Sequence, residues 1–95
     1  MRVPKKIQEM IKEASKESFE KCEVILFGSR VDDAKKGGDF DIAIKGCDRV
    51  QFKRGKIRFF KRLLLEDMDL PIDLVHYESV STLLQQEIDT KGVKL

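Results

Sequence analysis

The stretch VILFGSRVDDAKKGGDFDIAI, residues 24–44, decides the fold of this chain of 95 residues. An apolar run ends at Gly28, a polar link follows, and Asp39 and Asp41 open a second apolar run. Each run has the length and the β-branched content of a buried strand. The sequence therefore predicts two strands joined by a polar connection.

Two carboxylates stand at the start of the second predicted strand. Side chains alternate along a strand, so Asp39 and Asp41 point to the same side of it. Carboxylates that lie so close repel each other, and each raises the pKa of the other. A divalent cation relieves this repulsion because hard cations such as Mg²⁺ take carboxylate oxygens as ligands. The pair therefore predicts a metal site.

The end of the first predicted strand supplies groups that suit an anion. Gly28 has no Cβ, so a phosphate can approach the backbone closely, and Ser29 offers a hydroxyl and an amide N–H. A short helix over 30–36 would direct its free N–H groups to the same point. A glycine and serine after a strand most often form only a turn, but beside a metal site they indicate a nucleoside triphosphate.

The two motifs together resemble those of a known family. Gly28-Ser29-Arg30 followed by Asp39-x-Asp41 is similar to the minimal nucleotidyltransferases of the DNA polymerase β-like superfamily, over nearly the whole chain. That family has a third carboxylate on a later strand, for which Asp73 is the candidate. The resemblance implies ATP as substrate, one or two Mg²⁺ ions, and the following roles. By this resemblance, Gly28, Ser29 and Arg30 would bind the nucleotide. The metal ligands and catalytic residues would be Asp39, Asp41 and Asp73.

The remaining elements follow from apolar periodicity. Helices are expected over 4–19, 49–67 and 79–91, and a third strand over 72–76. Gly28 and Asp39 meet only if the first two strands are antiparallel, and Asp73 meets Asp41 if the third runs parallel to the second. We therefore expect an α/β (α+β) fold with a mixed three-stranded sheet in the order 1-2-3. Helices would cover one face, and the nucleotide would lie opposite, as in the polymerase β-like nucleotidyltransferase fold that the resemblance implies.

The overall composition sets limits on size and location. Ninety-five residues predict a single domain, 1–95, with a small core. A net charge of +2 is too small to argue for nucleic-acid binding, and we do not expect direct contact with nucleic acid. No apolar run is long enough to cross a membrane, and the basic start is not followed by the apolar stretch of a secretory signal. The expected location is the cytoplasm.

The two cysteines and the single histidine of the sequence are not assigned to the predicted site. Cys22 and Cys47 are expected to be free thiols, as is usual in the cytosol. A disulfide is the alternative, because antiparallel pairing of the first two strands would bring the two cysteines close together. His76 lies on the side of its strand opposite to Asp73, and we interpret it as a structural histidine.

Two helices leave alternatives open. The helix over 49–67 is strongly basic, which usually indicates a solvated face but also suits nucleotide phosphates, an acidic partner or RNA. The helix over 4–19 is amphipathic and is expected to pack on the sheet, with partner binding as the alternative. Small domains with an exposed apolar helix often dimerise, so a homodimer is a further expectation.

The resemblance also implies a function and a partner. The chain would transfer a nucleoside monophosphate, AMP from ATP, to a hydroxyl acceptor. Minimal nucleotidyltransferases are typically antitoxins that modify a tyrosine of a helical HEPN-domain toxin, so a HEPN-type protein is the implied partner. The alternative is a non-catalytic module that binds a nucleotide or a helical partner and neutralises that partner by complex formation.

Overall fold

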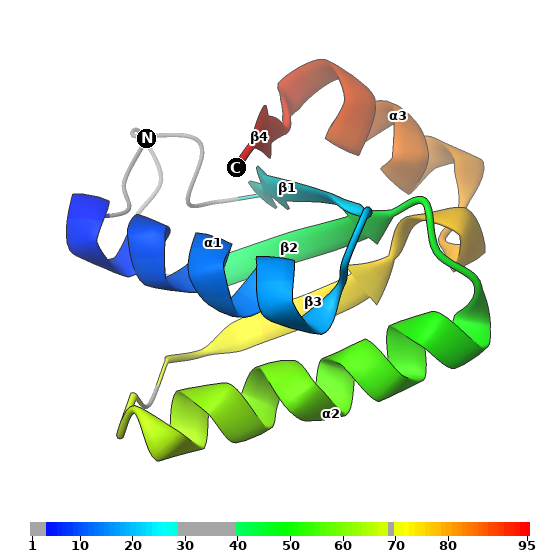
Figure 1. Ribbon diagram of the computed structural model, residues 1–95. Helices are drawn as coiled ribbons and strands as arrows, with labels where there is room; N and C mark the ends of the chain where they lie inside the picture. Colours follow the sequence, from blue (N-terminus) through cyan, green and yellow to red (C-terminus); the bar gives the residue numbers. More distant parts are fainter. Residues whose placement is uncertain (1–3, 29–39, 69) are drawn as a thin grey trace.

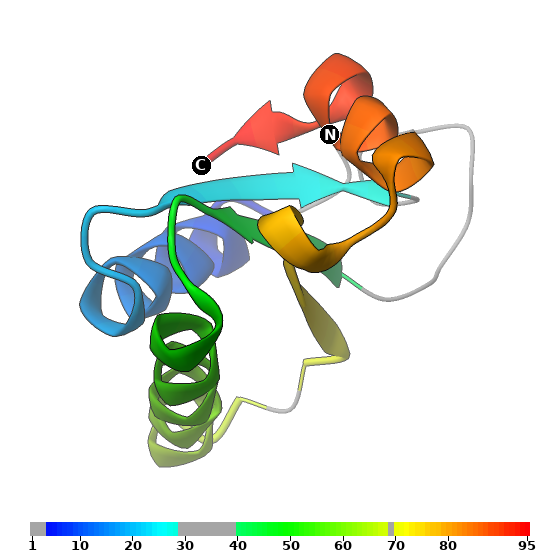
Figure 2. The same ribbon diagram turned by 90° about the vertical axis from the view of Figure 1, so that its right-hand side faces the viewer.

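The computed structural model describes residues 4–28, 40–68 and 70–95, and these form one mixed sheet with helices on both faces (Figures 1 and 2). In chain order the elements are α1 (Lys5–Ser18), β1 (Glu23–Phe27), β2 (Phe40–Lys45), α2 (Arg49–Leu65), β3 (Ile72–His76), the 3₁₀ turn η2 (Tyr77–Ser79), α3 (Thr82–Lys91) and β4 (Val93–Lys94). The expected helix over 30–36 lies outside the described residues. None of the described helices is long and apolar enough to cross a membrane.

The sheet has the strand order β3-β2-β1-β4. β1 and β2 are antiparallel, and β2 and β3 are parallel, so the predicted order and directions of the first three strands are confirmed. The expectation of three strands was incomplete, because Val93–Lys94 pair with Ile25 and Leu26 as a fourth, antiparallel strand. Gly92 makes this return possible, since a Cβ there would clash with the Ile88 carbonyl and the Ile25 side chain.

The main core lies between the sheet and the pair of helices α1 and α2 (Figure 1). Ile42 and Ile44 of β2 contribute to it from the sheet, and Ile11 of α1 and Phe59 of α2 close it from the helices. Each of these four side chains is essentially inaccessible to solvent. Packing of α1 on the sheet is therefore confirmed.

The expectation that the helices would cover one face was wrong for α3, which packs on the other face (Figure 2). Ile25 and Phe27 of β1 and Ala43 of β2 point to that face and are buried beneath Ile88. The central strands are apolar on both sides, so both faces of the sheet must be covered. The helix also begins later than predicted, because the Ser81 hydroxyl accepts the Leu84 amide at 3.2 Å and caps the helix there.

The two cysteines are free thiols, as expected. Cys22 precedes β1 and Cys47 follows β2, and antiparallel pairing of these strands brings the two thiols close together. Burial, followed by the proximity of Cys22, raises the pKa of Cys47 to about 12. Cys47 therefore behaves as a small buried apolar side chain rather than as a reactive thiolate.

Candidate active site

The predicted convergence occurs where β1 ends and β2 and β3 begin. In the strand register, Phe27 of β1 lies opposite Asp41 of β2, and Asp41 lies beside Asp73 of β3. Gly28 follows Phe27 directly, so three of the predicted site residues are neighbours across three adjacent strands. The other three, Ser29, Arg30 and Asp39, lie outside the described residues.

Gly28 is in direct contact with the Asp41 carboxylate. Its φ angle of +83° lies in the region that L side chains rarely adopt. A Cβ at this position would overlap Asp41 Oδ2 and would lie 3.2 Å from Asp41 Cγ. Glycine is therefore needed for two reasons, the backbone conformation and the space taken by the carboxylate. The glycine backbone and the carboxylate form one packed unit at this edge of the sheet.

Asp41 and Asp73 point to the face of the sheet that α3 covers. Alternation along β2 directs Phe40 and Ile42 into the core beneath α1 and α2, so Asp41 between them faces the other way. Asp41 is half-buried and Asp73 is exposed. Adjacent strands lie about 4.8 Å apart, so the two carboxylates project side by side from this face.

This donor set fits a hard divalent cation. The two carboxylates supply oxygen ligands of the type Mg²⁺ prefers, and Gly28 lets the Asp41 carboxylate lie directly against the backbone. Among residues 4–28, 40–68 and 70–95, no three His, Cys, Asp or Glu side chains lie close enough to form a cluster for a metal. Asp39, the third carboxylate predicted for this site, belongs to the part of the chain not described.

His76 lies on the other face of β3, as expected, and is buried. Its Nδ1 is 2.7 Å from the Ser79 hydroxyl, and its Nε2 is 2.5 Å from the Cys47 carbonyl. The ring also packs against Phe52 of α2, with 5.2 Å between the ring centroids. Both ring nitrogens thus join segments of the fold, which supports the interpretation of a structural histidine.

Sequence reasoning assigned no role to Tyr77, which joins η2 to α3. Its hydroxyl donates to the Asp89 carboxylate, at 2.9 Å from Oδ1 and 2.8 Å from Oδ2, and this hydrogen bond raises the pKa of Tyr77. Lys45 Nζ lies 4.5 Å from the centre of the tyrosine ring. This cluster fixes α3 on the same face as Asp41 and Asp73. Twelve residues separate Tyr77 from Asp89, so no local pattern signals the contact.

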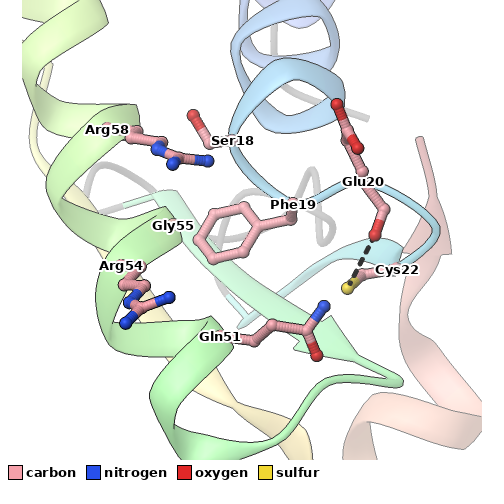
Figure 3. Close-up of a pocket in the computed structure, with 8 residues that line it drawn as sticks. All are labelled: Ser18, Phe19, Glu20, Cys22, Gln51, Arg54, Gly55 and Arg58. Atoms are coloured by element: carbon pink, nitrogen blue, oxygen red, sulfur yellow. Dashed lines mark hydrogen bonds between the residues drawn. The ribbon is translucent and has the colours of Figure 1, made fainter.

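A pocket of about 200 Å³ between the end of α1 and the middle of α2 lies away from these carboxylates (Figure 3). The Phe19 ring points towards Gly55, and Arg54 and Arg58 project from α2 beside it. The pocket is lined by Ser18, Phe19, Glu20, Cys22, Gln51, Arg54, Gly55 and Arg58. None of these is a predicted site residue, so the pocket is not the predicted nucleotide site.

Comparison with known proteins identified solved structures of similar fold. A chain of a toxin–antitoxin solved with AMP-PNP is 25% identical with a TM-score of 0.66, covering 92% of this chain and 70% of that one. A tyrosine-to-alanine mutant of the toxin–antitoxin MntA–HpeT contains a chain with 26% sequence identity and a TM-score of 0.68. The match covers 93% of this chain and 70% of that one. A mutant of MntA–HpeT with two aspartates changed to glutamate contains a chain with 25% sequence identity and a TM-score of 0.56. The match covers 94% of this chain and 68% of that one.

The sequence comparisons differ in outcome. No curated protein matches the chain. Residues 5–95 match the model of the family described as "Polymerase beta, Nucleotidyltransferase". The match begins at the first residue of α1 and includes all four strands. The chain therefore belongs to the polymerase β nucleotidyltransferase family.

Proposed function

We propose that this chain transfers AMP from ATP to a hydroxyl of a partner toxin and so acts as an antitoxin. The observation that carries the proposal is the register that brings Gly28, Asp41 and Asp73 together in a member of a nucleotidyltransferase family. The similarity to toxin–antitoxin chains, one of them solved with AMP-PNP, supports both the nucleotide and the setting.

In the proposed site, Asp39 and Asp41 would hold Mg²⁺, and Asp73 would complete a second metal position or accept the proton of the attacking hydroxyl. The bound ions would neutralise charge on the triphosphate and on the attacking and leaving oxygens. Gly28 leaves the Asp41 carboxylate its place against the backbone, and a phosphate could approach the glycine backbone closely because it has no Cβ. Ser29 and Arg30 would then bind the β- and γ-phosphates through a hydroxyl, an amide and a positive charge.

The proposed reaction is an in-line displacement at the α-phosphorus. The acceptor oxygen forms a bond to phosphorus, the bond from phosphorus to the α,β-bridging oxygen breaks, and pyrophosphate leaves. The hydroxyl proton passes to the Asp73 carboxylate or to water. Holding acceptor and nucleotide in this alignment supplies a large part of the rate enhancement.

The proposed acceptor is a tyrosine of a helical HEPN-type toxin. A solved toxin–antitoxin complex carries a tyrosine-to-alanine substitution, which supports a tyrosine as the residue of interest. The exposed position of Asp73 suits an acceptor that arrives on another chain, because the carboxylate can be reached from solvent.

The test combines the purified protein, magnesium, ATP labelled at the α-phosphate and the product of the adjacent gene. We expect label on that product, and loss of the label with Asp41→Asn and with Asp73→Asn. Asp67→Asn is the matched control, because Asp67 is exposed, lies after α2 and has a φ of +54° that asparagine adopts readily. Tight binding without label, equal in wild type and variants, would instead favour a non-catalytic binding module.

A further inference from the structure

The outer face of α2 carries an apolar stripe that nothing in the described fold covers. Gly55, Phe59 and Leu63 form the buried side of this helix. On the opposite side, Val50 is 60% exposed, Ile57 70% and Leu64 79%. α2 lies at the border of the molecule, with its outer side away from the sheet (Figure 1). Apolar exposure of this size, repeated along one helix, indicates a contact surface.

The spacing of the stripe is that of a helix–helix seam. Val50, Ile57 and Leu64 follow one another at intervals of seven residues, so they align along the helix at steps of about 10 Å. Between them on the same side lie the basic side chains of Lys53 and Lys61. We call these five residues the outer face of α2. A second helix laid along it would meet apolar and positive groups in alternation.

The charge on this helix is of one sign. The sequence of α2, RVQFKRGKIRFFKRLLL, holds seven Lys or Arg residues and no Asp or Glu. Arg62 is paired with Glu17 of α1 and with Glu66, on the side turned towards α1. The cations of the outer face have no such acidic neighbours within their own helix. A complementary surface must therefore be acidic between its apolar contacts.

These features favour a protein helix over other occupants. A second copy of this chain would set the same cations against each other, which is destabilising. The aromatic residues of α2, Phe52, Phe59 and Phe60, are buried or half-buried, so none is offered to stack on RNA bases. Cations interrupt the apolar stripe at every turn, unlike the continuous apolar face with which a helix enters a lipid surface.

We propose that the outer face of α2 docks an acidic amphipathic helix of the partner protein, with apolar residues every seventh position and Asp or Glu between them. The identity of that partner rests on the proposed function, but the docking does not depend on nucleotide transfer. α2 and the carboxylates Asp41 and Asp73 lie on opposite faces of the sheet. A partner held here therefore leaves the carboxylates uncovered.

The test measures binding of the adjacent gene's product by calorimetry, without magnesium or nucleotide. Ile57→Glu and Leu64→Glu should each weaken binding on the order of tenfold or more, as expected for apolar anchors at an interface. Leu83→Glu is the matched control, because Leu83 is also 79% exposed but lies on α3. It should bind like the wild type. Lys61→Glu should weaken binding and reduce its dependence on salt.

Several results would overturn the docking. The first is an unchanged affinity of both Ile57→Glu and Leu64→Glu for the adjacent gene's product. The second is an equal loss of affinity with Leu83→Glu, and the third is the absence of binding between the wild type and that product. Binding that depends on α2 only for an RNA oligonucleotide or for phosphatidylserine vesicles would overturn it as well. Failure of the proposed transfer reaction can be distinguished from failure of the docking. Asp41→Asn should abolish labelling of the partner, while its affinity for the partner should stay unchanged.

Discussion

Replacing Gly28 by alanine separates the two reasons for a glycine at this position. Gly28 and Gly46 have similar backbone conformations, with φ of +83° and +98°. A Cβ on Gly46 would have no atom within 4 Å, whereas a Cβ on Gly28 would overlap the Asp41 carboxylate. Gly46→Ala therefore measures the backbone strain alone, and Gly28→Ala measures the strain together with displacement of a proposed metal ligand.

The expected magnitudes differ between stability and activity. Backbone strain should lower the free energy of unfolding by about 1–2 kcal/mol in each variant, because alanine in the left-handed region costs that much. The overlap with Asp41 should add to this loss in Gly28→Ala. A domain of this size has about 5–15 kcal/mol of stability, so both variants should remain folded. A shift of the carboxylate by about 1 Å should lower the transfer rate roughly 100-fold in Gly28→Ala only.

The assay pairs urea denaturation with the initial rate of label transfer to the partner at saturating ATP. Gly46→Ala should lose stability and keep its rate. Wild-type rates in both variants would refute the reasoning that contact between Gly28 and Asp41 positions the carboxylate. A rate loss of the same size in both variants would refute it as well, because the loss would then come from backbone strain and not from the contact.

Three further outcomes are expected from contacts outside the site. Gly55→Ala should destabilise the fold by about 1–3 kcal/mol, measured by urea denaturation, because a Cβ there would overlap the Phe19 ring. Burial raises the pKa of Cys47 from its ordinary 9.0 to about 12, so the free energy of unfolding should fall as pH rises from 9 towards 12. In Cys47→Ala this fall should be smaller. The Tyr77 phenolate should form at lower pH in Asp89→Ala than in the wild type, followed by ultraviolet absorbance, because the hydrogen bond to Asp89 raises the pKa of Tyr77.

Strand positions could be predicted because each apolar run has a clear boundary. The sequence predicts a strand in the apolar run that ends at Gly28, which is β1, and a strand over 72–76, which is β3. The Gly28 turn ends the first run, and Pro71 precedes the second. The register of Asp41 with Asp73 also followed, because a strand, helix and strand of this length form a parallel pair. Local pattern and short connections were therefore enough for the described part of the site.

The missed features depend on contacts between distant segments. Val93–Lys94 have no periodicity of their own and form a strand only because the edge of β1 is available beside them. The start of α3 was set too early because apolar spacing does not reveal which serine caps the helix, and Ser81 does so. The spacing of Ile88 and its neighbours predicts an amphipathic helix but does not specify the face of the sheet on which it packs.

One face of the sheet builds the main core, and the other face carries the proposed catalytic carboxylates. Alternation along β2 directs Ile42 and Ile44 towards α1 and α2, where they build the main core, and leaves Asp41 for the opposite face. A one-residue slip of β2 against β1 would move Asp41 into that core and Ile42 to the opposite face of the sheet. Burial of an unpaired carboxylate costs far more than any packing it would gain. The apolar residues of β2 thus hold the proposed catalytic carboxylate in register, so the same alternation that stabilises the fold also positions the site.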